Sequence, residues 1–233
     1  MNRGTLAVLG MVLGVAAIGA ILSGRRPEDD DDETGKEPNE GEPMGSVSYK
    51  PGKGRPPGAL MAGDPKDPEI AAVLGELEDF LIGEGVPRDT WTAEEITRLP
   101  KGTIVNGRRP VAIPVRQLWP NMVGTLKLYR ELRATMGVPL SLRGYRPPDY
   151  NKAVGGAPSS THLWFAALDL YPPSADRSRL GLEGAKLYLK HSGEAIGLGI
   201  YGKPNPSDIH LDTGKSRRTW RETNYFLDKL KEA

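Results

Sequence analysis

The sequence predicts an α+β fold in which helices pack around a small antiparallel sheet. Three observations lead to this prediction. Apolar residues recur at helical spacing in two stretches before residue 137, short segments between residues 138 and 212 have the character of strands, and helical spacing returns near the C-terminus. The chain of 233 residues is long enough for one domain of ordinary size with appended segments.

The first predicted element is an apolar helix within residues 1–24. Thr5 to Ser23 contains no charged residue, with Arg3 before it and Arg25-Arg26 after it. A bilayer core of ~30 Å needs about 20 helical residues, so the stretch is long enough for a transmembrane anchor. A cleaved secretory signal is the alternative, although Ile18 occupies a position where cleavage prefers a small residue. In both cases the rest of the chain goes to a membrane or across it.

Residues 25–65 predict a flexible linker between this helix and the rest of the chain. They contain the acidic run Asp29 to Glu33 and are rich in Gly, Pro and Glu. Such a segment buries too little apolar surface to offset the entropy lost on ordering. We therefore expect a solvated tether, followed by a folded domain that spans residues 66–233.

Two stretches of this domain have the apolar spacing of amphipathic helices. The first is residues 70–81, which ends near Gly83, and the second follows Pro120 and ends at Gly137. Both apolar stripes are expected to form core rather than a ligand surface.

Shorter elements connect and follow these helices. The sequence Thr92-Ala-Glu-Glu is a capping-box signature for a short helix that Pro100 stops. Residues 102–116 predict an irregular strand or loop, and residues 138–143 a short strand that leads to Tyr145-Arg146. Later segments are predicted as a helix at 180–196, a strand at 197–201, a polar edge at 215–218 and a closing helix at 225–230.

The most informative stretch is Ser160 to Asp169, which contains a histidine and a carboxylate. On a straight helix the Cα atoms of His162 and Asp169 would be roughly 10 Å apart, too far for one ion. On one flat strand their odd spacing would send them to opposite faces. We therefore expect a loop that carries His162, followed by a short strand, Ala167 to Tyr171, from which Asp169 points back at the same ion.

The segment Asp208 to Asp212 supplies the third predicted ligand. Alternation places Asp208, His210 and Asp212 on one face of a strand and two apolar residues on the other. Two neutral imidazoles and one carboxylate leave a fourth tetrahedral position open, which is the pattern of a catalytic zinc site. The chain has no cysteine, so a thiolate site is excluded.

These motifs resemble the zinc D-alanyl-D-alanine carboxypeptidase family and its relatives among murein endopeptidases and phage endolysins. The resemblance rests on Ser160 to Asp169, on His210 to Gly214, and on the approach segments Gly144 to Asn151 and Val154 to Ala157. The motifs occur in the family's order, and the similarity extends over about residues 120–220. It implies a sheet that carries the zinc site, a fold also found in the hedgehog signalling domain.

The resemblance also implies roles for individual residues. Zinc would be held by His162, Asp169 and His210. Arg146 would hold a substrate carbonyl or carboxylate, with Tyr145 beside it in the substrate-binding region, and Ser160 would support the site.

Two positions depart from the family pattern. Phe165 stands where the family has glycine, which is expected to reshape the loop. Ser207 stands where many relatives have a glutamate as general base, and other members of the wider group keep their base at the position of Asp208. Asp208 is therefore the expected base and Asp212 the expected partner of an imidazole, with an exchange of these two roles as the alternative. The third histidine, His191, lies outside both motifs and is expected to be structural or at the surface.

The implied function is zinc-dependent cleavage of peptidoglycan stem peptides or cross-links at bonds that involve D-alanine. Such an enzyme would be membrane-anchored, with its domain periplasmic or extracellular, or virion-associated if it is phage-encoded. The alternatives are a zinc-containing binding module and an assembly protein of a virion or envelope. The net charge of +1 gives no indication of nucleic-acid binding.

Overall fold

The structure is a computed structural model that describes residues 56–99, 109–214 and 216–232. The predicted anchor Thr5 to Ser23 and the linker up to residue 55 lie outside the described residues. Within the described part, no helix has the length and apolar character needed to cross a membrane.

The described chain forms an α+β fold with helices and strands interleaved along the sequence. The α-helices are α1 (Pro68–Gly83), α2 (Ala93–Thr97), α3 (Pro120–Met136), α4 (Pro148–Ala153), α5 (Arg177–Lys190) and α6 (Thr223–Glu232). Short 3-10 helices are η1 (Arg116–Leu118), η2 (Thr161–Trp164) and η3 (Ser174–Asp176). The strands are β1 (Ala59–Gly63), β2 (Val111–Pro114), β3 (Ser141–Arg143), β4 (Ala167–Tyr171), β5 (Ile196–Tyr201), β6 (Asp208–Thr213) and β7 (Arg218–Arg221).

The main sheet has five strands in the order β3-β4-β6-β5-β7. Neighbouring strands are antiparallel except β5 and β7, which are parallel, so the expected antiparallel sheet is in fact mixed. The sequence did not predict β7, because Arg218-Thr-Trp-Arg221 is polar and lacks the alternation of a half-buried strand. The polar run expected at an edge does lead into the edge strand of the sheet.

A second, two-stranded sheet pairs β1 with β2 in antiparallel register. Strand β1 precedes Lys66, so the folded part begins before the predicted domain boundary. Alternating burial along β1 and the fully buried β2 explain why this segment is ordered despite its Gly-rich and Pro-rich surroundings.

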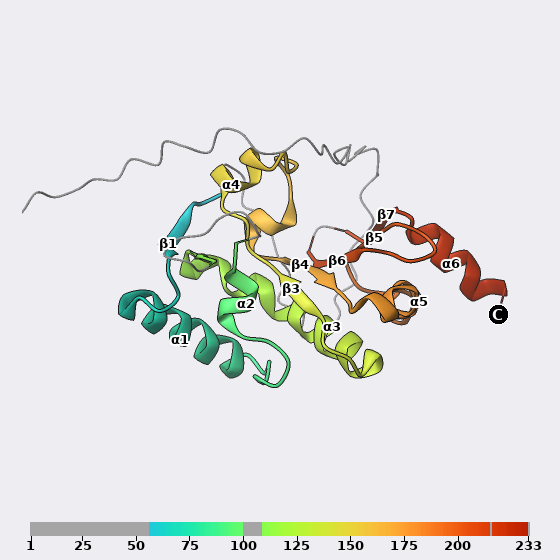
Figure 1. The fold of residues 1–233 in the computed structure, drawn as a ribbon, viewed down its shortest axis with the longest axis horizontal. Helices are drawn as coiled ribbons and strands as arrows, with labels where there is room; N and C mark the ends of the chain where they lie inside the picture. Colours follow the sequence, from blue (N-terminus) through green and yellow to red (C-terminus); the bar gives the residue numbers. More distant parts are fainter. Residues whose placement is uncertain (1–55, 100–108, 215, 233) are drawn as a thin grey trace, which may run out of the picture.

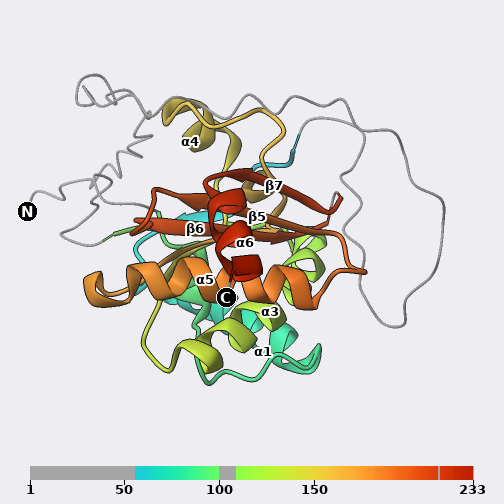
Figure 2. The ribbon, with the colours of Figure 1, turned by 90° about the vertical axis from the view of Figure 1, so that its right-hand side faces the viewer.

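The main sheet has one apolar and one polar face. Figures 1 and 2 show α1, α3 and α5 on one side of the sheet and α4 on the other. The apolar face packs on the larger helices, and its side chains are at most 1% exposed: Leu168, Leu170, Leu198, Ile200, Ile209 and Leu211. Closely packed aliphatic side chains of this kind hold the sheet rigid, which leaves the opposite face as a stable base for polar groups.

Within the described residues the predicted helices are confirmed, although one of them ends earlier than expected. Thr92 caps α2, since its hydroxyl accepts a bond from Glu95 N, and α3 ends at Gly137 in the left-handed conformation. The helix predicted for residues 180–196 ends at Lys190, because the apolar residues that follow alternate and enter β5.

Phe165, at the position where the resemblance implies a glycine, has a left-handed backbone conformation of the kind that glycine adopts most easily. Its φ is +55°, in the left-handed region that costs a residue with a Cβ roughly 1–2 kcal/mol. Its ring is fully buried and meets the ring of Tyr145 edge-on, with 6.0 Å between the ring centres. The aromatic side chain therefore offsets the strain by packing, and the turn after His162 keeps its shape without glycine.

This balance predicts an unusual order of stabilities for two variants. Phe165→Ala loses the buried ring and keeps the strain, so we expect its free energy of unfolding to fall by about 3–5 kcal/mol. Phe165→Gly loses the ring and also relieves the strain, so it should be about 1 kcal/mol more stable than the alanine variant. Urea denaturation measures both, and an alanine variant at least as stable as the glycine variant would contradict the prediction.

Candidate metal centre

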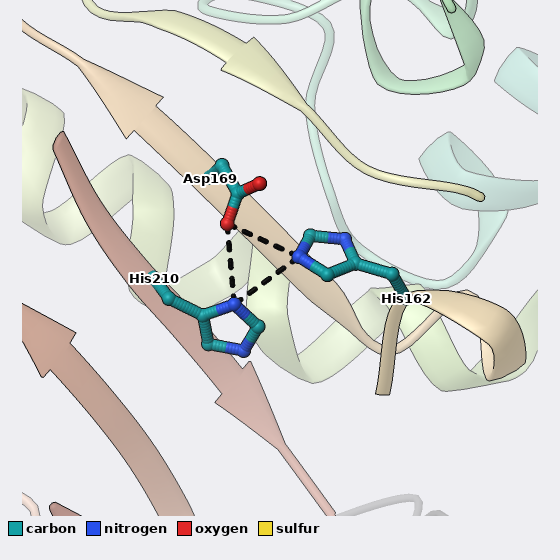
Figure 3. A group of neighbouring side chains, drawn as sticks. All are labelled: His162, Asp169 and His210. Atoms are coloured by element: carbon teal, nitrogen blue, oxygen red, sulfur yellow. Dashed lines mark hydrogen bonds and ion pairs between the residues drawn. The ribbon is translucent and has the colours of Figure 1, made fainter. Parts of the chain in front are cut away.

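Three predicted ligands converge on the polar face of the sheet. His162 Nε2, Asp169 Oδ1 and His210 Nδ1 form a triangle with sides of 3.1, 3.1 and 3.2 Å (Figure 3). All three side chains are buried, and among the described residues they form a group able to hold a metal ion. The other nitrogen of each imidazole bonds outside the triangle, so the three facing atoms present lone pairs that a shared cation can satisfy.

The triangle fits the size and chemistry of zinc. Zinc bonds of about 2.0–2.1 Å to nitrogen or oxygen place tetrahedral ligand atoms roughly 3.3 Å apart. The observed sides are close to that separation, and two imidazoles with one carboxylate are ligands that zinc takes readily. A metal of this class is therefore compatible with the residues that the chain provides.

Strand register brings two of the ligands together. Asp169 on β4 is directly opposite His210 on β6, so both side chains leave the same face of the sheet. His162 comes from η2, which is joined to the segment between β3 and α4 by a bond from Arg146 N to the His162 carbonyl. The predicted loop and the two predicted strands thus meet as the spacing argument required.

A backbone carbonyl orients the first imidazole. His162 Nδ1 lies 2.5 Å from the oxygen of Gly144 and donates to it, so Nε2 is free to face the ion. Gly144 has to be small, because a Cβ there would lie 2.6 Å from the Ile96 carbonyl oxygen.

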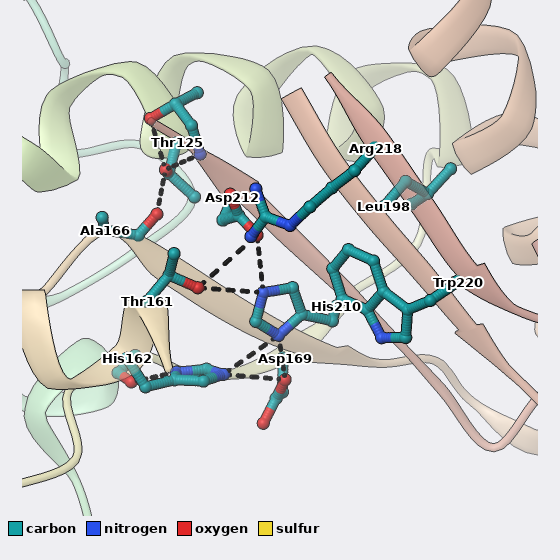
Figure 4. A network of polar contacts seen from close by, with 12 residues as sticks. Thr125, Thr161, His162, Ala166, Asp169, Leu198, His210, Asp212, Arg218 and Trp220 are labelled. Carbon is teal, nitrogen blue, oxygen red and sulfur yellow. Dashed lines mark hydrogen bonds and ion pairs between the residues drawn. The ribbon is translucent and has the colours of Figure 1, made fainter. Parts of the chain in front are cut away.

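A carboxylate orients the second imidazole. His210 Nε2 lies 2.9 Å from Asp212 Oδ2 and donates to it, which leaves Nδ1 for the ion (Figure 4). The Thr161 hydroxyl lies 3.4 Å from the same nitrogen. Asp212 is therefore on the far side of His210 from the ligand triangle, in the arrangement of an orienting partner.

The charges of the metal-free site follow from these contacts. Burial and the nearby Arg146 lower the pKa of His162 to about 4. Burial opposes the charge of His210, but hydrogen bonds to Asp169 and Asp212 outweigh it and raise the pKa of His210 to about 9. Burial likewise opposes the charge of Asp169, yet the charges of His162 and Arg146 hold its pKa well below the usual value. A metal ion would replace the proton that these anions hold on His210.

The other residues of the predicted site occupy different places. Arg146 donates through Nη2 to Asp169 Oδ2, so its guanidinium already contacts a ligand carboxylate. Ser160 is half-buried at the start of η2. Tyr145 lies in the core, 2% exposed, and its hydroxyl donates to the Pro57 carbonyl oxygen, so it contacts the body of the domain rather than the polar face.

Asp208 is the remaining predicted site residue. It is buried on β6, on the same face as His210, and its Oδ1 accepts a bond from the Ser207 hydroxyl. His191 lies apart from the triangle, as expected, and bonds through its two nitrogens to Glu194 and Glu131.

Sequence reasoning missed the role of three further residues around His210. Thr161 and Arg218 contact its polar partner Asp212, and the ring of Trp220 lies against its imidazole. Thr161 is adjacent to a predicted ligand and could have been considered. Arg218 and Trp220 carried no signal, since the strand that places them was not predicted.

The α+β fold carries a buried His-Asp-His triangle suited to a metal ion, which defines a candidate metal-binding domain. Residues 100–212 match the family Peptidase M15, and this part of the chain is a domain of that family, which includes the D-alanyl-D-alanine carboxypeptidases. The resemblance inferred from the motifs is thereby confirmed. No curated protein matches the chain.

Zinc should stabilise the native state through the triangle alone. At free zinc 100 times the dissociation constant, we expect about 2.7 kcal/mol of stabilisation, measured as a rise in thermal midpoint. His162→Ala and His210→Ala should abolish this rise, whereas His191→Ala, a matched histidine outside the triangle, should retain it. An equal rise in all three variants would place the zinc elsewhere.

Proposed function

We propose that the chain is a zinc-dependent peptidoglycan peptidase that cleaves stem-peptide or cross-link bonds involving D-alanine. The observation that carries the proposal is the ligand triangle, in which both imidazoles are oriented by a second acceptor. Three protein ligands are the set that hydrolytic zinc sites use, because the fourth position serves water or substrate. The M15 domain supports a peptide substrate.

His162, Asp169 and His210 would hold the ion. When bound, zinc would polarise the scissile carbonyl and activate water for attack. Asp208 would take the proton from the attacking water at its carboxylate and pass it to the amine nitrogen as the C–N bond breaks. Its place on the face of β6 that carries His210 supports this role.

Arg146 would combine two tasks. One of its five N–H donors contacts Asp169 and orients that ligand, and its side chain remains 27% exposed. The remaining donors can bind a carbonyl or carboxylate of the peptide, in the manner that favours arginine at planar anions.

The test is digestion of purified peptidoglycan by the full-length chain, in zinc and in chelator, with the released fragments identified by mass. We expect products only with zinc. Asp208→Asn should lower the rate by about 10²–10⁴-fold because the base is lost, while zinc still raises the thermal midpoint. Asp228→Asn, which changes an exposed carboxylate paired with Lys231, is the matched control and should keep the rate. An Asp208→Asn variant with unchanged turnover would show that another residue is the base.

A zinc-containing binding or assembly protein is the second candidate. It is favoured by Ser207, which stands at the position where many relatives carry a glutamate as general base. The hydroxyl of Ser207 bonds to Asp208. A folded chain that gains stability from zinc yet releases no fragments from peptidoglycan would support this role over catalysis.

We also propose that Thr5 to Ser23 anchors the protein in a membrane, with the domain on the periplasmic or extracellular side or on a virion. The uncharged sequence between flanking arginines supports this proposal. The full chain should remain with the membrane after alkaline carbonate extraction, and Leu13→Arg, a charge in the middle of the stretch, should release it. Extraction of the unaltered chain by carbonate would contradict an anchor.

A further inference from the structure

Strand β7 lies beyond the residues that match the M15 family, yet it faces the candidate metal site. It pairs with β5 in parallel, with Arg218 opposite Gly197 and Trp220 opposite Gly199. On its other side β5 places the same two glycines opposite Asp212 and His210. Two rows of residues therefore cross the sheet, and each joins a β7 side chain to a residue of the site.

The two glycines leave room for these side chains to meet. A Cβ on Gly199 would lie 2.4 Å from the ring of Trp220, and a Cβ on Gly197 would lie 2.4 Å from Asp212 Oδ2. A side chain at Gly199 would displace the Trp220 ring, and one at Gly197 would displace the Asp212 carboxylate. Because β5 has no side chain there, residues two strands apart come into direct contact.

Arg218 balances the buried charge of Asp212. Its Nη2 lies 2.8 Å from Asp212 Oδ2, the oxygen that also accepts from His210. Asp212 is fully buried, and within the described chain its Oδ1 has no hydrogen-bond partner. A buried carboxylate with an unpaired oxygen is costly unless a cation is close, and Arg218 supplies one.

Trp220 confines the imidazole from its other side. The two ring centres are 5.1 Å apart at an angle of 61° (Figure 4). Trp220 Nε1 donates to the Tyr201 hydroxyl at 3.2 Å. This bond fixes the indole on the polar face of the sheet. The imidazole of His210 is thus bounded by Asp212 at one nitrogen and by an indole at its ring, which restricts its rotation.

We propose that β7 is the outer support of the metal site, with Arg218 and Trp220 as positioning residues that hold His210 Nδ1 toward the ion. The proposal rests on the zinc-dependent function above and assigns to this edge strand a part in metal affinity. Neither residue offers a ligand atom to the ion. Arg218 would act through Asp212, and Trp220 through its contact with the His210 ring.

The test compares variants of β7 with a neighbouring arginine that has a purely structural contact. Arg217 donates to the carbonyl oxygens of His191 and Tyr188 at 2.7 and 2.6 Å, at the end of α5. Arg217→Ala should therefore lower the thermal midpoint without changing zinc affinity. Arg218→Ala should weaken zinc binding about 10–100-fold in competition with a chromophoric chelator, the usual effect of losing an outer partner of a ligand.

Conservative variants and a spectroscopic signature complete the experiment. Arg218→Lys keeps the charge and should recover part of the zinc affinity that Arg218→Ala loses. Trp220→Phe should bind zinc more tightly than Trp220→Ala. The visible absorption bands of bound Co²⁺ report ligand geometry and should shift in Arg218→Ala and Trp220→Ala but not in Arg217→Ala.

The outcomes separate the two proposals. If the unaltered chain binds zinc and the Arg218 and Trp220 variants bind it equally well with unchanged Co²⁺ bands, β7 is only structural and the inference is overturned. If the unaltered chain binds no zinc, the proposed function fails and the support role fails with it. If Arg218→Ala does not fold, Arg218→Lys and the two Trp220 variants decide by the same measurements.

Discussion

The pairing of β4 with β6 is the constraint on which the site depends. It sets Asp169 beside His210 on one face of the sheet. The neighbouring residues of both strands, Leu168, Leu170, Ile209 and Leu211, lie on the other face. Because side chains alternate with a period of two, a slip by one residue would bury the ligands under α3 and expose the core. The apolar face thus fixes the register, and the register in turn fixes the distance between two ligand atoms. Stability and chemistry are coupled in the same pair of strands.

The buried polar groups form layers that compensate one another. The triangle is surrounded by the Gly144 carbonyl, Asp212 and Arg146, and Asp212 is in turn contacted by Arg218. Each layer satisfies hydrogen bonds of the layer inside it, as burial of charged groups requires. This arrangement holds the two imidazoles in defined orientations in the protein itself, so little reorganisation is required of the ligands. An aromatic residue is tolerated at position 165 for a separate reason, because the contact of its ring with Tyr145 keeps the turn after His162 in place.

Much of this site was predictable from local sequence. The alternation in Asp208 to Asp212 reports a strand with one polar face, and the odd spacing of His162 and Asp169 excludes a single helix or strand for both. The cap at Thr92 and the glycine at the end of α3 are likewise local signals, since their hydrogen bonds involve residues only a few positions away. Family motifs added the approach segment. Tyr145, in contrast, belongs to a matched motif but packs in the core, because a motif does not reveal which side of the backbone a side chain leaves.

The sequence by itself determined the candidate ligand set, the strands that carry it and the helices that cover the apolar face, because each leaves a periodic or short-range pattern. Only the tertiary structure decided the mixed topology, the contact of Arg146 with Asp169, and the contacts of β7 with Asp212 and His210. Apart from Trp220, strand β7 is polar, so it shows no apolar alternation. Its partner strand is determined by the path of the chain past the end of β5. The contacts of Arg218 and Trp220 with the site depend on two glycines of β5, the strand that lies between β6 and β7. This relation appears only once the sheet is assembled.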